Sequence, residues 1–468
     1  MVDLLIISFL PIYIFIALKS PNKAFLLWVL LSPLSNNYLF KLSFLATGEL
    51  APGLTFDRIA IGVLLLSLIL RGELKKPISS RFNQLERWMI VFISVLTIEL
   101  IFTYRPKDAT RMFLNIFDCF VIPFLGYYFA KYLIIEKGSF NKKFFNNFLT
   151  IAVVCGCYLA LMGIYEGLTH IDLLPGPETQ YTIAHGGGLR VSTGFARVNG
   201  PFINPETFGT VLSITFFILL YKARINIHSV KGKNIFGNIK YLVIGIAILM
   251  ALGFNLFRSI WLGLLFGLVC QFILIPGVRS KWILITILIS PIIFIIWVTL
   301  GSSNLLENRI LQTGTFFDRL GAYIYCLRAF AQNPIIGIGF GRLPKYIEHA
   351  FESGDIIYVE GFKAANYAHN TFLSLLAENG IIGLIPYIFI LYSIVKILRS
   401  NYSHSLNYFG KNWIVTVVSI FVTYLPPLFF DKVGYYPKVN NLFFIIIGMM
   451  VGSMQRNLTK LHNKSSGN

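Results

Sequence analysis

The sequence predicts an all-α polytopic membrane protein, and three observations lead to this fold class. Hydrophobic residues make up 56% of the 468 residues and charged residues only 13%, about half the share usual in a soluble domain. Apolar runs of about 16 to 25 residues, enough to cross the hydrocarbon core of a bilayer, recur along the whole chain. Basic residues collect in alternate connections between these runs. Because no proline- or serine-rich linker divides the chain, residues 1–468 are expected to form a single integral membrane domain.

The apolar runs predict about 12 or 13 transmembrane helices. They lie near residues 3–18, 24–46, 56–71, 88–104, 112–134, 145–166, 205–222, 240–257, 259–277, 282–300, 371–395, 412–430 and 440–455. The second run is the weakest, since Pro33 and the pair Asn36-Asn37 interrupt it. The pattern does not fix the side of the membrane on which the N-terminus lies.

The distribution of charge predicts which connections face the cytoplasm. The formal net charge is +19, which in a soluble protein would suggest binding to nucleic acid. Here the excess follows the rule that cytoplasmic loops are rich in lysine and arginine, so the expected surroundings are membrane lipids and no nucleic acid is expected. The residues that define these loops are Arg71, Lys75, Lys76, Arg81, Arg87, Lys131, Lys137, Lys142, Lys143, Lys222, Arg224, Lys231, Lys233, Lys240, Arg279, Lys281, Lys396, Arg399 and Lys411.

Two long connections, 167–204 and 301–370, fall on the opposite, extracytoplasmic side. Connections of this length on a compact scaffold usually carry function. The periodicity of the second predicts short helices within it, for instance over 317–332. His369 therefore stands where the large outer loop re-enters the membrane.

The polar residues around His369 are unusual for a membrane helix. Asn370 is a preferred N-cap residue, so a structural interpretation makes the pair a helix cap and an interfacial histidine. An imidazole at this position is also suitably placed to act as a base. Glu378 lies about 13 Å further along an unbroken helix, and a carboxylate inside a membrane is usually paired or functional. Gly380 and Gly383 are expected to admit close packing of another helix or a lipid.

Four arginines are candidates for binding an anion at the outer face. Arg258 interrupts a nearly continuous apolar stretch, and Arg197 precedes a helix start at Asn204-Pro205-Glu206. Arg319 and Arg328 lie in the large outer loop. The planar guanidinium group suits phosphate oxygens, and a helix N-terminus favours an anion in the same way.

This combination predicts a lipid-linked diphosphate as the substrate, with its hydrophilic head group outside. Cationic groups can neutralise the charge that develops on a leaving diphosphate, so no protonating acid is required. The incoming sugar hydroxyl is a weak nucleophile, and His369 is the candidate base that activates it.

No metal and no other cofactor is expected. The chain contains no Asp-x-Asp motif of the kind that holds a metal–diphosphate complex, and its five cysteines show no metal-site or disulfide spacing. Glu348, His349, Glu352 and Asp355 carry ligand atoms, but polar residues on an exposed loop are more often a solvated surface.

Three stretches combine into a family pattern. His369-Asn370 is followed, after nine residues, by Gly380-Ile-Ile-Gly383; Arg258 stands four residues before Leu262; and NPIIGIGFG occupies 333–341. Over roughly residues 195 to 455, the chain resembles the O-antigen ligase and Wzy-type polymerase superfamily of bacterial envelope glycosyltransferases. The resemblance implies a GT-C-like membrane fold and a glycosyl transfer that needs no metal.

The same resemblance implies roles for single residues. His369 is similar to the base that activates the acceptor hydroxyl, and Arg258 and Arg197 are similar to the arginines that hold undecaprenyl diphosphate. The paired Arg-x10-Gly motif of the polymerases is matched once, from Arg328 to Gly339, and missed by one residue in the earlier outer loop.

The expected function is transfer or polymerisation of an undecaprenyl-diphosphate-linked oligosaccharide at the outer face of the bacterial cytoplasmic membrane, with the active site facing the periplasm or exterior. A polymerase, whose acceptor is another lipid-linked repeat, is favoured over an O-antigen ligase, whose acceptor is lipid A core, because it needs no second kind of lipid acceptor. The alternative from another class is a transporter or flippase for lipid-linked saccharides. The chain shows none of the repeats common in transporters, and its unusual polar residues gather at the outer face.

Overall fold

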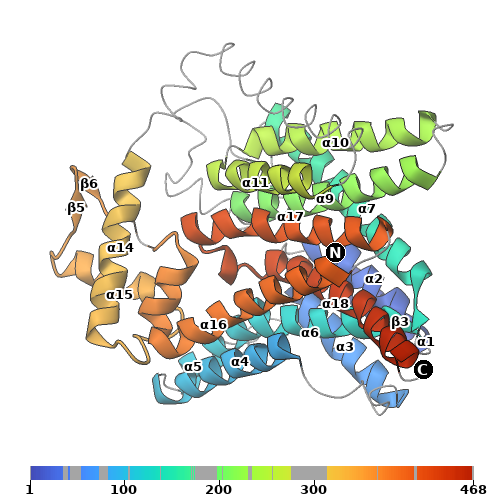
Figure 1. Cartoon of the computed structure of the whole chain (residues 1–468). Coiled ribbons are helices and arrows are strands. Elements are labelled where there is room, and N and C mark those ends of the chain that lie inside the picture. The colour runs from blue at the N-terminus through green and yellow to red at the C-terminus, as the bar shows by residue number, and fades with distance from the viewer. Residues whose placement is uncertain are drawn as a thin grey trace.

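The computed structural model describes residues 2–34, 41–42, 54–72, 83–103, 106–136, 139–169, 171, 173, 198–202, 204–229, 235–255, 257–275, 314–365, 367–404 and 408–465. These residues form a bundle of long helices with a small helical unit at one end (Figure 1). Within the described ranges, strands are limited to three two-residue antiparallel pairs: β1 (Lys41–Leu42) with β2 (Leu54–Thr55), β3 (Ile135–Glu136) with β4 (Ser139–Phe140), and β5 (Tyr358–Val359) with β6 (Phe362–Lys363). The predicted all-α fold class is confirmed.

The bundle is built from helices that span most of the chain. They are α1 (Val2–Lys19), α2 (Pro21–Leu31), α3 (Phe56–Leu70), α4 (Gln84–Thr103), α5 (Pro106–Ile116), the π-helical turn Phe117–Val121, α6 (Ile122–Leu133), α7 (Lys142–Thr169), α9 (Pro205–Ser229), α10 (Ile235–Asn255), α11 (Arg258–Leu274), α16 (Thr371–His404), α17 (Tyr408–Phe430) and α18 (Pro437–Ser465). The large connection before α16 contains α14 (Gly314–Gln332), α15 (Leu343–Glu352) and the β5–β6 pair. We call these last elements the end cap; they lie together at the left of Figure 1.

Several helices are long and apolar enough to cross a membrane. Among the described residues these are Ala109–Leu133, Lys142–Thr169, Pro205–Asn226, Thr371–Ser403, Tyr408–Phe430 and Pro437–Met454, with shorter apolar helices over Phe9–Lys19, Ile239–Asn255 and Arg258–Leu274. The chain is therefore a polytopic membrane protein, as predicted. The predicted span 282–300 lies outside the described residues.

One predicted span, 24–46, differs from the observed helix. The helix α2 ends at Leu31 and a 3-10 turn follows over Ser32–Leu34. The reason is Pro33, which has no backbone N–H to continue the hydrogen bonds of the α-helix. At about 1.5 Å per residue, α2 is too short to cross a bilayer by itself.

Hydrogen bonds between helix ends show which helix ends lie together at each end of the bundle. At one end, Lys396 donates to the Gln84 side chain over 3.2 Å and Lys222 donates to Thr150 over 2.6 Å. At the other end, Arg342 donates to the Thr103 carbonyl over 2.6 Å. Lysines predicted to face the cytoplasm therefore share one end, which we call the basic end. The end cap lies at the other end (Figure 1). His369 contacts Tyr323 of the end cap, so we call this end the histidine end.

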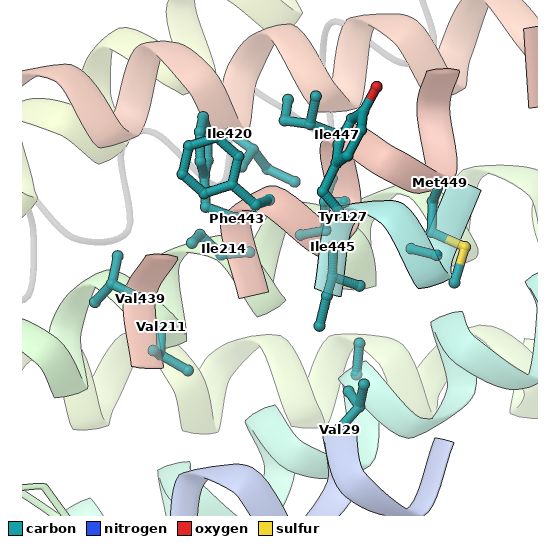
Figure 2. Close-up of a cluster of buried hydrophobic side chains, with 14 of the residues drawn as sticks. Val29, Tyr127, Val211, Ile214, Ile420, Val439, Phe443, Ile445, Ile447 and Met449 are labelled. Atoms are coloured by element: carbon teal, nitrogen blue, oxygen red, sulfur yellow. The ribbon is translucent and has the colours of Figure 1, made fainter. Parts of the chain in front are cut away.

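The helix α18 lies at the centre of the bundle. It packs against α6, α17 and α9, and apolar residues on all its faces are buried, as expected for a helix with no polar face. Its side chains Val439, Phe443, Ile445, Ile447 and Met449 pack with Val29, Tyr127, Val211, Ile214 and Ile420 (Figure 2).

Two glycines allow the backbones of α6 and α18 to approach closely. A Cβ at Gly448 would lie 2.2 Å from the Tyr127 carbonyl oxygen, and one at Gly452 would lie 2.7 Å from the Lys131 carbonyl oxygen. Small residues four positions apart permit such contact between membrane helices.

Gly448→Ala is expected to lower the thermal stability of the detergent-purified protein. The added methyl group meets backbone that can move only if α6 and α18 separate, and overpacking of this kind costs about 1–3 kcal/mol. The matched control is Gly245→Ala on α10, where the nearest atom to a Cβ, in Leu219, lies at 3.6 Å. Melting followed by intrinsic fluorescence provides the comparison, and equal melting temperatures of the two variants would contradict the expectation.

A buried ion pair ties α3 to the start of α18. Lys438 of α18 pairs with Asp57, which also accepts a hydrogen bond from the Trp28 indole over 2.9 Å. Next to it, the partly buried Arg58 donates to both carboxylate oxygens of Asp118, in the π-helical turn before α6, at 2.8 Å. Removing one member of a buried pair is costly, so the Lys438–Asp57 pair holds the start of α18 in place. It thereby fixes the connection between α17 and α18 at the histidine end.

Candidate functional site

His369 is held by the residues on both sides of it. Asn370 caps α16, because its side-chain oxygen accepts a hydrogen bond from the Leu373 N–H over 2.9 Å. Its amide nitrogen donates to the Phe429 carbonyl at the end of α17, also over 2.9 Å. The hydroxyl of Tyr323 in the end cap donates to the His369 carbonyl over 3.4 Å. His369 itself has a φ of +46°, an uncommon value for a residue other than glycine, and such backbone persists only where neighbouring contacts impose it.

Asp431 faces the imidazole of His369. It follows α17 directly, its side chain is only 1% exposed, and one carboxylate oxygen lies 3.8 Å from Nδ1 of His369. The same oxygen accepts hydrogen bonds from the Lys432 N–H over 2.6 Å and the Tyr436 hydroxyl over 3.0 Å. A carboxylate next to Nδ1 orients an imidazole and leaves proton transfer to Nε2.

Burial raises the pKa of Asp431 above its ordinary value. The hydrogen bonds from the Lys432 backbone and from Tyr436, and the positive charge of Arg319, lower this pKa and offset the rise in part. The Glu206 side chain, from the first turn of α9, also reaches Asp431. Groups from several elements thus act on the pKa of Asp431, and burial is the largest influence.

Asp431 is not among the site residues that the sequence predicts. A signal was present, because an acid stands between two predicted spans, 412–430 and 440–455, on the same side as His369. More than 60 residues separate it from His369 along the chain, so only the fold brings the two side chains together.

Arg319 lies beside the same group of residues. Its guanidinium donates to the Phe430 carbonyl over 3.1 Å, one residue before Asp431. Tyr323 follows it by one helical turn on α14, so both residues lie on the face that meets α17. The structure therefore brings Arg319 together with His369, as the proposed anion site requires.

An apolar cleft leads away from this group along the bundle. It has a volume of about 550 Å³, and its walls come from α11, α17 and the residues next to His369. The lining residues are Leu262, Phe266, Tyr323, Asn370, Val422, Leu425, Pro426, Phe429 and Phe430. Its polar atoms belong to the two members nearest the histidine, Tyr323 and Asn370, so the cleft has a polar mouth and an apolar interior.

Arg258 stands at the outer end of one wall of this cleft. It is the first residue of α11 and is exposed. Leu262 and Phe266 follow at intervals of four residues, and residues so spaced share one face of a helix. The arginine therefore precedes, on the same face of α11, the apolar residues that line the cleft.

The structure places the other two candidate arginines differently. Arg328 pairs with Asp355 over 2.9 Å, and both side chains are about half exposed. It lies nine residues beyond Arg319 on α14, a distance of about 13 Å along the helix axis. Arg197 lies outside the described residues.

The helix α16 breaks at Gly380, which has φ 59° and ψ −161°. The segment NPIIGIGFG crosses this break: Ile338 donates to the Ala377 carbonyl over 3.0 Å, and Ile381 donates to the Pro334 carbonyl over 3.0 Å. A Cβ at Gly380 would lie 2.2 Å from the Ile335 carbonyl oxygen. The glycine is thus required both by its left-handed backbone and by the close approach of the segment. Gly383 lies one turn later, against the Asn379 side chain.

The contacts of the segment before Gly380 correct the depth inferred for Glu378. The expected depth of about 13 Å assumed that the helix runs straight into the membrane from its first residue. The segment before Gly380 instead runs from the end of α17, where Thr371 donates to the Asp431 carbonyl over 3.1 Å, to α4, where Asn379 donates to Glu99. Glu378 therefore lies near the histidine end of the bundle.

Glu378 is fully buried and joins three elements. One carboxylate oxygen accepts from the Leu343 N–H at the start of α15 over 3.3 Å and lies 4.0 Å from the Lys432 ammonium. The other accepts from the Tyr435 hydroxyl over 3.0 Å. A carboxylate at a helix N-terminus is stabilising, so Glu378 fastens the end cap to the connection that contains Asp431.

No group of three or more His, Cys, Asp or Glu side chains in the described ranges is arranged to hold a metal ion. In the end cap, His349 lies 3.3 Å from Glu352, and both side chains are more than half exposed. Asp355 pairs with Arg328.

Fold and site together define a class: a multi-pass membrane protein with a largely covered His–Asp pair beside an apolar cleft, one wall of which is a helix that begins at an arginine. Residues 242–388 match the family model described as O-antigen ligase, which confirms the resemblance to the O-antigen ligase-related superfamily over this part of the chain. The match supports an activity of the ligase or polymerase type on lipid-linked glycans. It includes Arg258, Arg319 and His369, but ends before Asp431. No curated protein matches the chain.

The two arginines of α14 provide a test of the site's boundary. Arg319→Gln is expected to reduce glycan transfer by roughly 10- to 100-fold, because a charge-assisted contact in a partly desolvated site contributes several times more than an exposed one. Arg328→Gln, which loses only an exposed ion pair, should stay within about threefold of the wild type. The measurement is the initial rate of each variant in liposomes. Equal losses in the two variants would show that Arg328 contributes to the anion site as much as Arg319.

Proposed function

We propose that the protein transfers glycan from an undecaprenyl-diphosphate carrier at the outer face of the bacterial cytoplasmic membrane, and that it acts as a polymerase of a surface polysaccharide. The observation that carries this proposal is the position of His369 at the polar mouth of an apolar cleft. A lipid-linked diphosphate has the same order of parts: an apolar chain, an anionic linker and a hydrophilic sugar.

Each part of such a donor has a matching group in the site. The polyprenyl chain occupies the cleft between α11 and α17, where Leu262 and Phe266 form one wall. The diphosphate lies at the mouth, where Arg258 and Arg319 neutralise its charge. The sugar extends toward His369 and the end cap.

The transfer itself is a single displacement. His369 removes the proton from the acceptor hydroxyl as the hydroxyl oxygen attacks the anomeric carbon. The bond between that carbon and the diphosphate oxygen breaks, and the diphosphate leaves with the bonding electrons. The two arginines stabilise the charge that develops on the leaving group. Asp431 stabilises the imidazolium that forms when His369 accepts the proton.

The second candidate is an O-antigen ligase, which is favoured by the description of the matching family. Its donor and chemistry are the same, but its acceptor is lipid A core. The polymerase is proposed first because one kind of lipid-linked substrate then serves as both donor and acceptor.

The test is transfer by the purified protein in liposomes that contain undecaprenyl-diphosphate oligosaccharide, with and without lipid A core, and with a chelator in a parallel reaction. Longer lipid-linked chains without lipid A core would support the polymerase. Product only with lipid A core would support the ligase. Loss of product with the chelator would contradict transfer without a metal. No product in any reaction, together with movement of the donor across the bilayer, would support the transporter instead.

A further inference from the structure

Tyr367 lies directly against His369 and remains exposed. The centroids of the two rings are 4.2 Å apart and the rings are tilted by 42°. The tyrosine is 45% exposed, whereas Ala368 between the two residues is buried. The left-handed backbone of His369 turns the chain so that two residues separated by one position face each other.

This arrangement limits how an acceptor can approach. His369 is largely covered, with 16% of its side chain exposed, and Asp431 occupies the side of Nδ1. A hydroxyl group that reaches the imidazole must therefore arrive beside the tyrosine ring. The sugar ring that carries the hydroxyl is then placed against an exposed aromatic face, which presents an apolar surface with a polar tip.

We propose that Tyr367 is the platform for the acceptor saccharide, and that its ring stacks on the sugar whose hydroxyl His369 activates. This assignment rests on the proposed function and adds the binding site of the acceptor to it. The ligand class is a neutral or acidic saccharide ring with one apolar face. Tyr367 is a binding residue in this assignment, distinct from the diphosphate site formed by Arg258 and Arg319.

The backbone on both sides of Tyr367 is attached to α14. The carbonyl of His369 accepts a hydrogen bond from Tyr323, and Ala365 donates to the Asp318 carbonyl over 2.9 Å. Attached backbone leaves fewer conformations to be lost when a ligand binds.

The test separates acceptor binding from support of the histidine. The acceptor probe is the repeat-unit oligosaccharide released from its lipid carrier and capped as a methyl glycoside. Initial rates at saturating donor give the acceptor KM and kcat for the wild type, Tyr367→Leu, Tyr367→Phe and Tyr367→Trp. The matched control is Tyr358→Leu, which removes a 60% exposed tyrosine of the end cap.

Tyr367→Leu is expected to raise the acceptor KM roughly tenfold, with kcat within about threefold and the donor KM within about twofold of the wild type. Tyr367→Phe, Tyr367→Trp and Tyr358→Leu should keep the wild-type acceptor KM. A lower kcat with unchanged acceptor KM would show that the ring only supports His369 and would overturn the proposal. A raised donor KM in place of the acceptor KM, or a loss in Tyr367→Phe equal to that in Tyr367→Leu, would overturn it as well.

Binding measured without turnover distinguishes failure of this inference from failure of the proposed function. Saturation-transfer NMR of the capped oligosaccharide is recorded on the wild type and on Tyr367→Leu in detergent. Suppose that the wild type transfers no glycan but binds the probe, and that Tyr367→Leu does not bind it. This result would support Tyr367 as a saccharide-binding residue and contradict the proposed glycan transfer. Equal signals from both proteins would overturn the platform.

Discussion

His369→Asn is expected to reduce glycan transfer about 1,000-fold while leaving the protein folded. A positioned general base contributes roughly 10²- to 10⁴-fold to a rate, and His369 is the imidazole at the polar mouth of the cleft. Asparagine is the informative replacement because it tolerates the left-handed backbone that His369 adopts. His369→Ala should lose the same activity and, in addition, some stability, because alanine tolerates this backbone poorly.

The matched control for this variant is His349→Asn. His349 lies in the end cap, its side chain is 82% exposed, and it pairs with the exposed Glu352. We expect wild-type rates from it. Rates are measured in liposomes after each variant has been compared with the wild type by thermal melting. A His369→Asn protein that keeps more than about a tenth of the wild-type rate would exclude His369 as the base.

Asp431→Asn is expected to reduce transfer roughly 100-fold and to change its pH dependence. The loss should be smaller than the about 10⁴-fold loss typical of a directly hydrogen-bonded Asp–His pair, because the two side chains are 3.8 Å apart. In the wild type, kcat should fall on the acid side as Asp431 becomes neutral, and this fall should occur above the ordinary pKa of an aspartate because burial raises the pKa. In Asp431→Asn the contribution of Asp431 to this limb should be lost, so that only the protonation of His369, the proposed base, lowers the rate on the acid side.

The same substitution should not cost stability near neutral pH. A group whose folded-state pKa is raised contributes stability below its unfolded-state pKa, and that contribution is lost as the pH rises through the folded-state pKa. Asparagine keeps the uncharged form at every pH, so Asp431→Asn should melt at or above the wild-type temperature. If Asp431 contributes to activity and not to stability, Asp431→Asn should transfer glycan more slowly without melting at a lower temperature.

The control is Asp318→Asn in α14, where burial also raises the pKa of the carboxyl group but the side chain is not paired with His369. It should keep both the rate and the acid limb. The titration curve of Asp431 includes contributions from Glu206, Arg319 and Tyr436, so the contribution of Asp431 to the limb is assigned by its loss in the variant. An acid limb that persists unchanged in Asp431→Asn would assign it to another group.

The sequence determined the fold class, most spans and the residue at the centre of the site. Apolar runs predict membrane helices because burying hydrophobic side chains in lipid requires only local composition and length. His369, Asn370, Gly380 and Gly383 were found because they occupy one short stretch with a fixed spacing. Pro205 and Asn370 also predicted the helix starts that the structure shows. These features are local, so a single sequence contains them.

The tertiary structure decided which distant residues meet. Asp431 reaches His369 only because α17 and α18 are packed so that the connection between them meets the start of α16. Arg319 and Arg328 look alike in the sequence, yet the fold places one at the cleft and pairs the other with Asp355. The surroundings of Glu378 depend on contacts with Leu343 and Tyr435, which lie far from it in the sequence, so helix periodicity does not predict them. Local patterns fix elements because they act within a few residues, whereas the site depends on packing between segments far apart in the chain.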